Sequence, residues 1–412
     1  MTIHAQSLNF HYVKFDLIDG VRMHKSKLFK IVFILLAGLT LAGFQCSSTE
    51  LTSAKLYIQQ KNWDKALTAL EKDVEKNPKS DEGYYLLGVV YGEKETYDKM
   101  MEAFNNSLAI SNTYKSQIDD SKKYYWANLF NRGVGYYQKG STTTNKDSSK
   151  ILLDKSALNF ESATVIEPDS AATFKNLAFV YLAGGETNKA IEPLKKLINL
   201  EKSEDGYKYL GELYYDQGTN EKNKYLTSKD PQDSLKAQED FNNAIQVLEK
   251  GKADFPNNGD ILLTLSNAYI SAGKVDVAIN AFKEGVEKDP NNQYYRYNYG
   301  VLLLGKNDFE DAVEQFKKAI DIAPDYQNAI YNLAVTYVKW GTAINKENED
   351  KGIMDNTQYK DKFQQALPYL EKSVQLEPKN AIVWDLLGKV YSVLGMENDA
   401  QNAFNKADAL RK

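Results

Sequence analysis

The segment from Gln293 to Pro324 carries a hydrophobic pattern that recurs through most of the chain. Its apolar and small residues follow a period of 3.6 residues, first before Gly305 and again after Asp308. The turn-forming residues 305–308 interrupt the period, and Pro324 ends the second stretch. The pattern predicts two short amphipathic helices joined by a tight turn. Because so short a pair cannot bury both apolar stripes, it needs similar pairs on either side.

Copies of this unit follow one another at a spacing of about 34 residues. With Gln293 as position 1, position 8 is small, position 11 is usually Tyr, position 20 is usually Ala and position 24 is large. Matching sets are Gly88/Tyr91/Phe104, Ala178/Tyr181/Ala190/Leu194, Ser266/Tyr269/Ala278/Phe282 and Gly388/Tyr391/Ala400/Phe404. Small side chains let paired helices approach closely, and the large ones fill the space beside them.

This pattern resembles the tetratricopeptide repeat family, and Trp384-x-x-Leu387-Gly388-x-x-Tyr391 is similar to that family's signature. The resemblance covers the chain after about residue 47. It implies an all-α fold, a right-handed superhelical solenoid of about nine helix-turn-helix repeats. Within residues 47–412, we expect the repeats to begin near residues 47, 81, 126, 171, 204, 259, 293, 327 and 381.

Three of the predicted repeats contain extra residues between their two helices, at Ser141–Lys155, Thr219–Ala237 and Thr342–Phe363. Each insertion begins with polar residues and then regains a helical pattern. In the second, Asp230-Pro231 has the order of an N-cap followed by Pro at the first helical position. Because the insertions fall at the same turn, we expect them along one edge of the solenoid, either as a docking ridge or as variable loops.

The N-terminal residues have a different pattern. Residues 1–22 show no clear period, and we expect them to be a non-native extension, with translation beginning at Met23. Lys25, Lys27 and Lys30 then precede an apolar run over residues 31–43. A positive stretch followed by a short apolar run is typical of a signal peptide, and the run is too short to span a bilayer comfortably. We therefore expect a signal peptide over residues 23–46.

Cys46 is the one cysteine of the chain and is the last residue of this segment. The arrangement resembles a bacterial lipoprotein signal, which implies lipid attachment at Cys46. However, Phe44 and Gln45 stand where that family has small residues, and Leu41-Ala42-Gly43 lies two residues too early. The alternatives are a secretory signal cut after Ala42 or Gly43, and an uncleaved membrane anchor. We expect an exported protein held at the bacterial envelope by an N-terminal lipid, facing the periplasm or the cell surface. A soluble secreted or periplasmic protein is the second choice.

Composition removes several classes of function. A net charge of −5 argues against a nucleic-acid surface, which needs a basic face. All three His lie at or before His24, so cleavage near Cys46 would leave no His for His-dependent catalysis or for a Cys/His zinc site. No glycine-rich phosphate-binding motif occurs. We expect no enzyme activity, no cofactor, no metal site and no small-molecule substrate.

The family resemblance implies a concave groove lined by the first helix of each repeat, which binds a protein or peptide ligand. Asn amides can donate to and accept from a peptide backbone, and Tyr offers contact area with few rotatable bonds. Lys175 and Lys208 would hold an acidic group. The alternative is that these residue types are simply common at these positions. The candidate residues are Tyr85, Phe130, Asn131, Lys175, Asn176, Lys208, Tyr294, Tyr297, Asn298, Tyr331 and Asn332.

These features predict a non-enzymatic, membrane-tethered scaffold that binds proteins or peptides in its groove. A second hypothesis is an accessory subunit of a cell-envelope assembly or enzyme complex that docks through its inserted segments.

Overall fold

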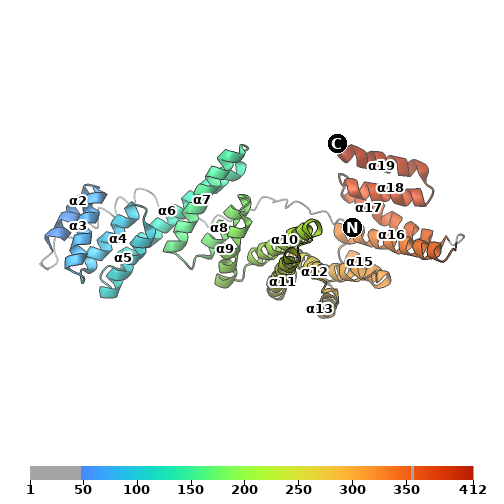
Figure 1. Cartoon of the computed structure of the whole chain (residues 1–412), viewed down its shortest axis with the longest axis horizontal. Helices are drawn as coiled ribbons and strands as arrows, with labels where there is room; N and C mark the ends of the chain where they lie inside the picture. The colour runs from blue at the N-terminus through green and yellow to red at the C-terminus, as the bar shows by residue number, and fades with distance from the viewer. Residues whose placement is uncertain (1–47, 354–356, 412) are drawn as a thin grey trace. The chain divides into compact units, whose positions relative to one another are not determined.

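The structure, a computed structural model, describes residues 48–353 and 357–411. Over these ranges the chain forms 18 α-helices and no strand (Figure 1). The predicted all-α fold is therefore confirmed. The expectations for residues 1–22, for the signal peptide over residues 23–46 and for Cys46 lie outside the described residues. In the part that the structure describes, no helix is long and apolar enough to cross a membrane.

The chain divides into two compact units between Gly185 and Glu186. In the first unit, α3 packs against α4 and α7 packs against α8. The second helix of one pair therefore contacts the first helix of the next pair. Its helices are α2 (Thr49–Gln59), α3 (Trp63–Lys76), α4 (Asp81–Glu93), α5 (Tyr97–Ile110), α6 (Lys115–Thr142), α7 (Lys146–Ile166) and α8 (Ala171–Ala183).

In the second unit, four first helices (α10, α12, α14 and α16) lie side by side in succession, and the second helices pack behind them. We call the exposed side of these four helices the inner face. The helices of this unit are α9 (Thr187–Leu200), α10 (Glu204–Ser228), α11 (Pro231–Asp254), α12 (Gly259–Ser271), α13 (Val275–Lys288), α14 (Gln293–Gly305), α15 (Phe309–Ile322), α16 (Gln327–Asp350), α17 (Gln358–Leu376), α18 (Ala381–Val393) and α19 (Glu397–Arg411).

Many first helices begin directly after a side chain that caps them. Asn258 accepts a hydrogen bond from the backbone N–H of Ile261 at 2.8 Å, and Ser80 accepts one from Gly83 at 3.1 Å. Such caps satisfy backbone donors that have no partner inside the helix. The same arrangement precedes other first helices, at Ser170, Ser203, Asn292 and Asn380.

The small and large positions of the repeat meet inside the α4/α5 and α14/α15 hairpins, as the sequence predicts. A Cβ atom added to Gly88 would lie 2.4 Å from the ring of Phe104, and one added to Gly300 would lie 2.9 Å from the ring of Phe316. Both rings are fully buried. Glycine therefore sets how closely the two helices of a pair can approach.

The first two insertions are mostly helical. The first two hairpins that contain them are α6/α7 and α10/α11, whose helices run for 21 to 28 residues where α4 has 13. Asp230 caps α11 and Pro231 is its first residue, as predicted. However, α10 continues to Ser228, so the insertion lengthens both helices of its pair and not only the second.

A tyrosine at position 11 links successive repeats through a hydrogen bond that the sequence analysis did not anticipate. The hydroxyl of Tyr391 donates to Glu371 at 2.9 Å, and that of Tyr269 donates to Glu249 at 2.8 Å. Each bond joins the second helix of one pair to the first helix of the next. Tyr91 to Glu71 and Tyr181 to Glu161 repeat the arrangement, always with 20 residues between the partners.

Because of these tyrosines, the free energy of unfolding should fall at alkaline pH. Burial and the adjacent carboxylate raise the pKa of Tyr91 and of Tyr391 from 10.0 to about 12. A raised pKa means that the stabilisation is complete below pH 10 and is lost as the pH rises through about 12. Tyr391→Phe should cost about 0.5–1.5 kcal/mol at pH 7. The difference between wild type and variant, measured by urea denaturation, should shrink by pH 12; a constant difference would contradict this origin.

Candidate binding surface

The inner face is held together by polar contacts between neighbouring first helices. Lys208 of α10 forms an ion pair with Asp260 of α12. One helix further on, the hydroxyl of Ser266 donates to Oδ1 of Asn298 at 3.1 Å. Asn332 of α16 donates through Nδ2 to the hydroxyl of Tyr297 at 2.9 Å. Each step from α10 to α16 is therefore bridged by at least one side chain that was predicted to contact a ligand.

Four of the predicted groove residues are buried and serve packing instead of surface contact. They are Tyr85, Asn176, Tyr297 and Asn298. Asn298 has no exposed surface, and its amide donates to the backbone carbonyl of Tyr294 at 2.8 Å. A ligand would reach these four side chains only if the helices repacked, so their contact with a ligand stays a prediction.

The remaining candidates of the first unit are partly accessible. Phe130 is half-buried. The centre of its ring lies 5.2 Å from the centre of the Trp126 ring and 5.5 Å from the centre of the Phe160 ring. Asn131 is exposed. Lys175 is half-buried, with its ammonium 5.8 Å from the centre of the Phe179 ring. These side chains belong to α6 and α8, which contact each other through a hydrogen bond of 3.0 Å from Trp126 to Thr173.

The expected anion site at Lys175 and Lys208 is not supported. The two residues belong to different units of the structure, and the ammonium of Lys208 already pairs with Asp260. The missed residue is Asp260, which lies 52 positions beyond Lys208 because an insertion separates their helices. The neighbourhood of Lys208 is acidic overall, which is the opposite of the sequence-based expectation.

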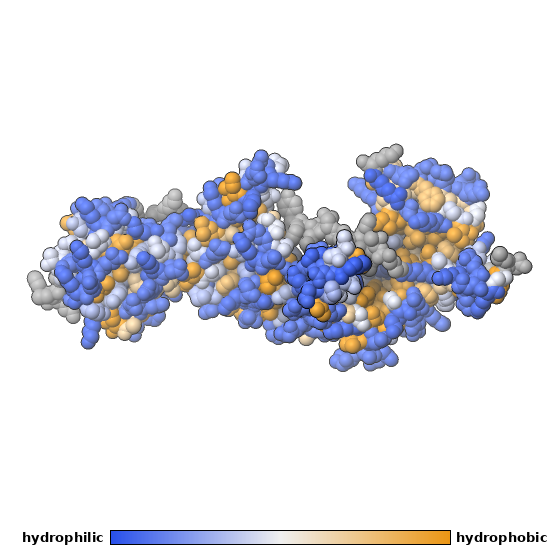
Figure 2. All heavy atoms as spheres, in the orientation of Figure 1, coloured by the Kyte–Doolittle hydropathy of each residue, from blue (hydrophilic) through white to orange (hydrophobic). Residues whose placement is uncertain are grey.

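The inner face presents half-buried apolar side chains from three successive helices. Leu263 of α12, Val301 of α14, and Tyr331 and Val335 of α16 all rest on the same hydrophobic core. Tyr294 and Asn332, two further candidates, are also half-buried here. The visible surface of the protein is mostly hydrophilic, with apolar side chains in separate patches (Figure 2). Tyr331 is therefore the tyrosine of the candidate set best suited to contact a ligand, since Tyr297 is buried.

Two carboxylates stand beside this apolar surface on α10. Glu212 and Asp216 are half-buried and are four residues apart, which places them on the same side of the helix. Burial raises the pKa of Glu212 from 4.5 to about 7, with Lys208 opposing the shift and Asp260 and Asp216 adding to it. Burial also raises the pKa of Asp216. The negative charges of the ionised Glu212 and Asp216 are therefore only weakly stabilised by their surroundings.

Glu212→Gln should therefore stabilise the protein at high pH. Between pH 4.5 and about 7 the folded chain keeps a proton on Glu212 that the unfolded chain releases, so stability falls as the pH rises through this window. Above it, the substitution removes the penalty and should raise the free energy of unfolding on the order of 1 kcal/mol. At pH 4.5 the two proteins should be equally stable. Urea denaturation at pH 4.5 and pH 8 measures both values, and a variant that is less stable at pH 8 would refute the shift.

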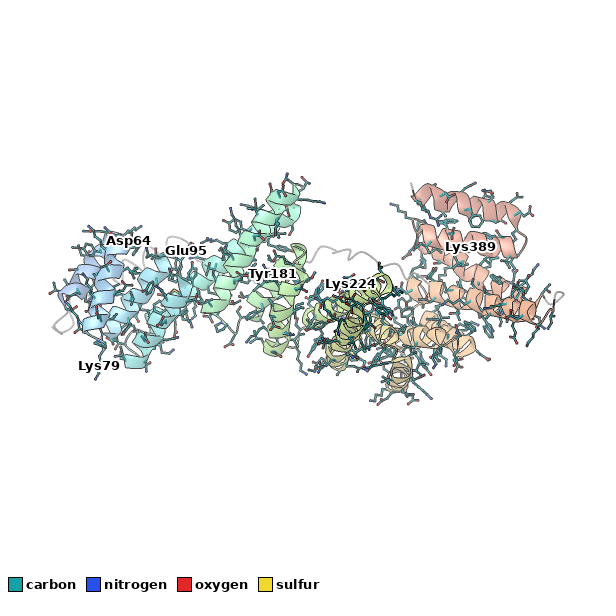
Figure 3. The ribbon with its side chains drawn as sticks, viewed as in Figure 1. Asp64, Lys79, Glu95, Tyr181, Lys224 and Lys389 are labelled. Carbon is teal, nitrogen blue, oxygen red and sulfur yellow. The ribbon has the colours of Figure 1, made fainter. Side chains whose placement is uncertain are left out.

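A second exposed surface lies near the end of the long α10/α11 hairpin. Leu226 and Leu235 are 58% and 64% exposed. Ion pairs surround them: Lys224, on α10 in Figure 3, pairs with Asp233, and Lys236 pairs with Glu221. In the first unit, Ile151 and Leu158 of α7 are exposed to 55% and 62%. The lengthened hairpins thus carry exposed aliphatic side chains.

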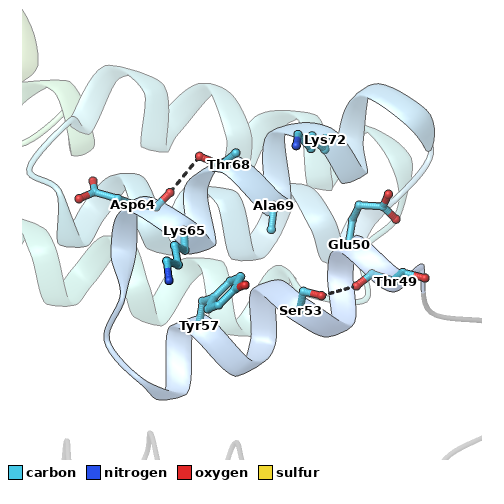
Figure 4. Close-up of a pocket in the computed structure, with 9 residues that line it drawn as sticks. All are labelled: Thr49, Glu50, Ser53, Tyr57, Asp64, Lys65, Thr68, Ala69 and Lys72. Atoms are coloured by element: carbon cyan, nitrogen blue, oxygen red, sulfur yellow. Dashed lines mark hydrogen bonds between the residues drawn. The ribbon is translucent and has the colours of Figure 1, made fainter.

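A shallow hollow between α2 and α3 is lined by both polar and apolar side chains (Figure 4). The hydroxyl of Ser53 donates to the carbonyl of Thr49 at 2.8 Å, and that of Thr68 to the carbonyl of Asp64 at 3.1 Å. The ammonium of Lys65 lies 5.8 Å from the centre of the Tyr57 ring. Within residues 48–353 and 357–411, no group of three or more His, Cys, Asp or Glu is arranged to hold a metal ion.

Comparison with known proteins gives three segments that match tetratricopeptide repeat family models, at residues 50–80, 81–114 and 263–326. The chain is 23% identical over 399 residues to TPR repeat-containing protein MJ1428 of Methanocaldococcus jannaschii, spanning 86% of this chain and 68% of that protein. It is 22% identical over 320 residues to the peroxisomal targeting signal receptor of Kluyveromyces lactis, spanning 69% of this chain and 56% of the receptor.

Among solved structures, yeast Tom70 is 15% identical with a TM-score of 0.35, over 88% of this chain and 84% of that one. YrrB, described as a TPR protein with an unusual peptide-binding site, is 20% identical with a TM-score of 0.31, over 55% of this chain and 96% of that one. The chain is thus an all-α array of helix pairs, and three segments of it match tetratricopeptide repeat models.

Proposed function

We propose that this protein is a non-enzymatic scaffold that binds a protein or peptide partner on the inner face of residues 186–412. The observation that carries the proposal is the row of half-buried apolar side chains on successive first helices, which includes Leu263, Val301 and Tyr331. Tyrosine beside aliphatic side chains is a composition favoured where proteins bind one another. The name of the Kluyveromyces lactis relative, a receptor for a targeting signal, fits this class of function.

A second candidate function is docking through the long hairpins, as an accessory subunit of a cell-envelope complex. Leu226 and Leu235 favour it, because exposed aliphatic side chains on a helical projection are available to a partner.

Two double variants separate these functions. Tyr331→Ala with Val335→Ser removes apolar area from the inner face, and Leu226→Ser with Leu235→Ser removes it from the hairpin. The assay is affinity capture from detergent-solubilised membranes with the wild type and each variant. An inner-face scaffold loses its partner only with the first change. Loss with the second change alone would instead establish docking through the hairpin.

The proposal includes a lipid tether at Cys46, which would hold the exported chain at the bacterial envelope. Its support is the single Cys that follows the basic and apolar stretch of residues 24–43. Cells fed an alkyne-tagged fatty acid should label the wild type and not the Cys46→Ser variant. An unlabelled wild type that partitions with the soluble fraction would favour the secreted form.

A further inference from the structure

The charge pattern of the inner face leaves two carboxylates, Glu212 and Asp216, without an ion-pair partner. Lys208 is the nearest ammonium on α10, and Asp260 already pairs with it. In the described ranges of the chain, no hydrogen bond or ion pair joins the side chain of Glu212 or Asp216 to another residue. Holding two partly desolvated carboxylates on one side of a helix is unfavourable in the free protein. A cationic side chain placed between them would relieve that cost.

The apolar part of the inner face begins on the neighbouring helix. Leu263 and Ile270 of α12 are half-buried, as is Val301 of α14. The helices α10, α12 and α14 are direct neighbours in that order. Packed helices lie about 8–10 Å apart, so one or two helix spacings separate the carboxylates from these apolar side chains. An extended chain advances about 3.3 Å per residue. Those spacings correspond to roughly three to six residues of a bound segment.

We propose that the inner face of residues 186–412 selects an extended protein segment in which a Lys or Arg is followed, about three to six residues away, by aliphatic or aromatic side chains. The basic side chain contacts Glu212 and Asp216, and the apolar side chains cover Leu263 and Val301. This inference rests on the proposed function and specifies the chemistry of the partner. Charge complementarity supports it, because an acidic segment would meet two carboxylates that repel it.

The test uses the full chain and fluorescence anisotropy of a labelled decapeptide probe. The probe carries Arg at its second position, Leu at its sixth and Phe at its eighth, with Ala, Gly and Ser elsewhere. Matched probes replace Arg by Gln or Glu, or replace Leu and Phe by Ser. We expect the Glu probe to bind at least about 10-fold more weakly than the Arg probe, because like charges meet. The Ser probe should also bind more weakly.

The variant Glu212→Gln/Asp216→Asn should abolish the advantage of the Arg probe over the Gln probe and leave the Gln probe unchanged. Its control is Glu310→Gln/Glu314→Gln, which makes the same change of charge at the same spacing on the exposed side of α15. The control should keep the preference for Arg. Equal weakening by both variants would overturn the inference, since overall charge would then explain the preference.

The remaining outcomes distinguish the two proposals. If the probes bind with no dependence on charge, or if the Glu probe binds best, the inference is overturned and the proposed function stands. If no probe binds while Tyr331→Ala with Val335→Ser leaves partner capture intact, the proposed function fails and the inference fails with it.

Discussion

Replacing Phe316 with alanine is expected to lower the free energy of unfolding of the 186–412 unit by about 3–5 kcal/mol. The ring has no exposed surface and fills the space beside Gly300, against the core that also contains Tyr297 and Leu333. Because α14 and α15 meet at this ring, its removal leaves a cavity between the two helices of a pair. The loss can be measured by urea denaturation at pH 7, together with faster amide hydrogen exchange in α14 and α15.

The control for this experiment is Val277→Ala on α13. Val277 is 57% exposed, so its truncation should change stability by less than about 0.5 kcal/mol. Equal losses for the two substitutions would mean that the Phe316 ring does not join the helices of the pair.

Gly88→Ala is expected to destabilise the first unit by about 1–3 kcal/mol, although alanine is the better helix former. The added Cβ would lie 2.4 Å from the ring of Phe104, which is fully buried and cannot move away without disturbing α5. Thermal denaturation of wild type and variant measures the loss.

The matched substitution is Gly135→Ala on α6. Gly135 also lies within a helix, but nothing is within 4 Å of a Cβ atom at this position. Here the gain in helix propensity should stabilise the protein by up to about 1 kcal/mol. If both substitutions were stabilising, this would contradict the claim that Gly88 is needed for the close packing of α4 against α5.

The sequence predicted the helix pairs well because their determinants are local. A 3.6-residue period, a Ser or Asn cap and a small residue facing a large one act within a single hairpin, as at Gly300 and Phe316. The start of α11 followed from one dipeptide, Asp230-Pro231. The repeat spacing then extended this local pattern along the chain.

The inner face could not be predicted from position alone. Tyr297 and Tyr331 occupy the same place in successive repeats, yet the first is buried against Asn332 and the second remains partly accessible. Whether such a tyrosine is buried depends on the side chain that the neighbouring helix places opposite it. The partner of Lys208, Asp260, is separated from it by an insertion, so no fixed spacing linked the two.

One inter-repeat contact could have been found in the sequence. Tyr91, Tyr181, Tyr269 and Tyr391 each follow a Glu by 20 residues, and each donates to that carboxylate. A recurrent Glu–Tyr spacing of this kind is a signal of stacking between helix pairs rather than of a ligand site. The role of an aromatic residue in a repeat can therefore be assigned only once the residues of the adjacent repeat are considered.

That the inner face of residues 186–412 receives the partner is tested most directly by amide hydrogen exchange of the full chain, with and without the Arg-containing probe. Binding at the inner face predicts slower exchange over residues 208–216, 263–270 and 297–304, and unchanged exchange over residues 219–237. Slower exchange confined to residues 219–237, with the inner helices unaffected, would contradict it.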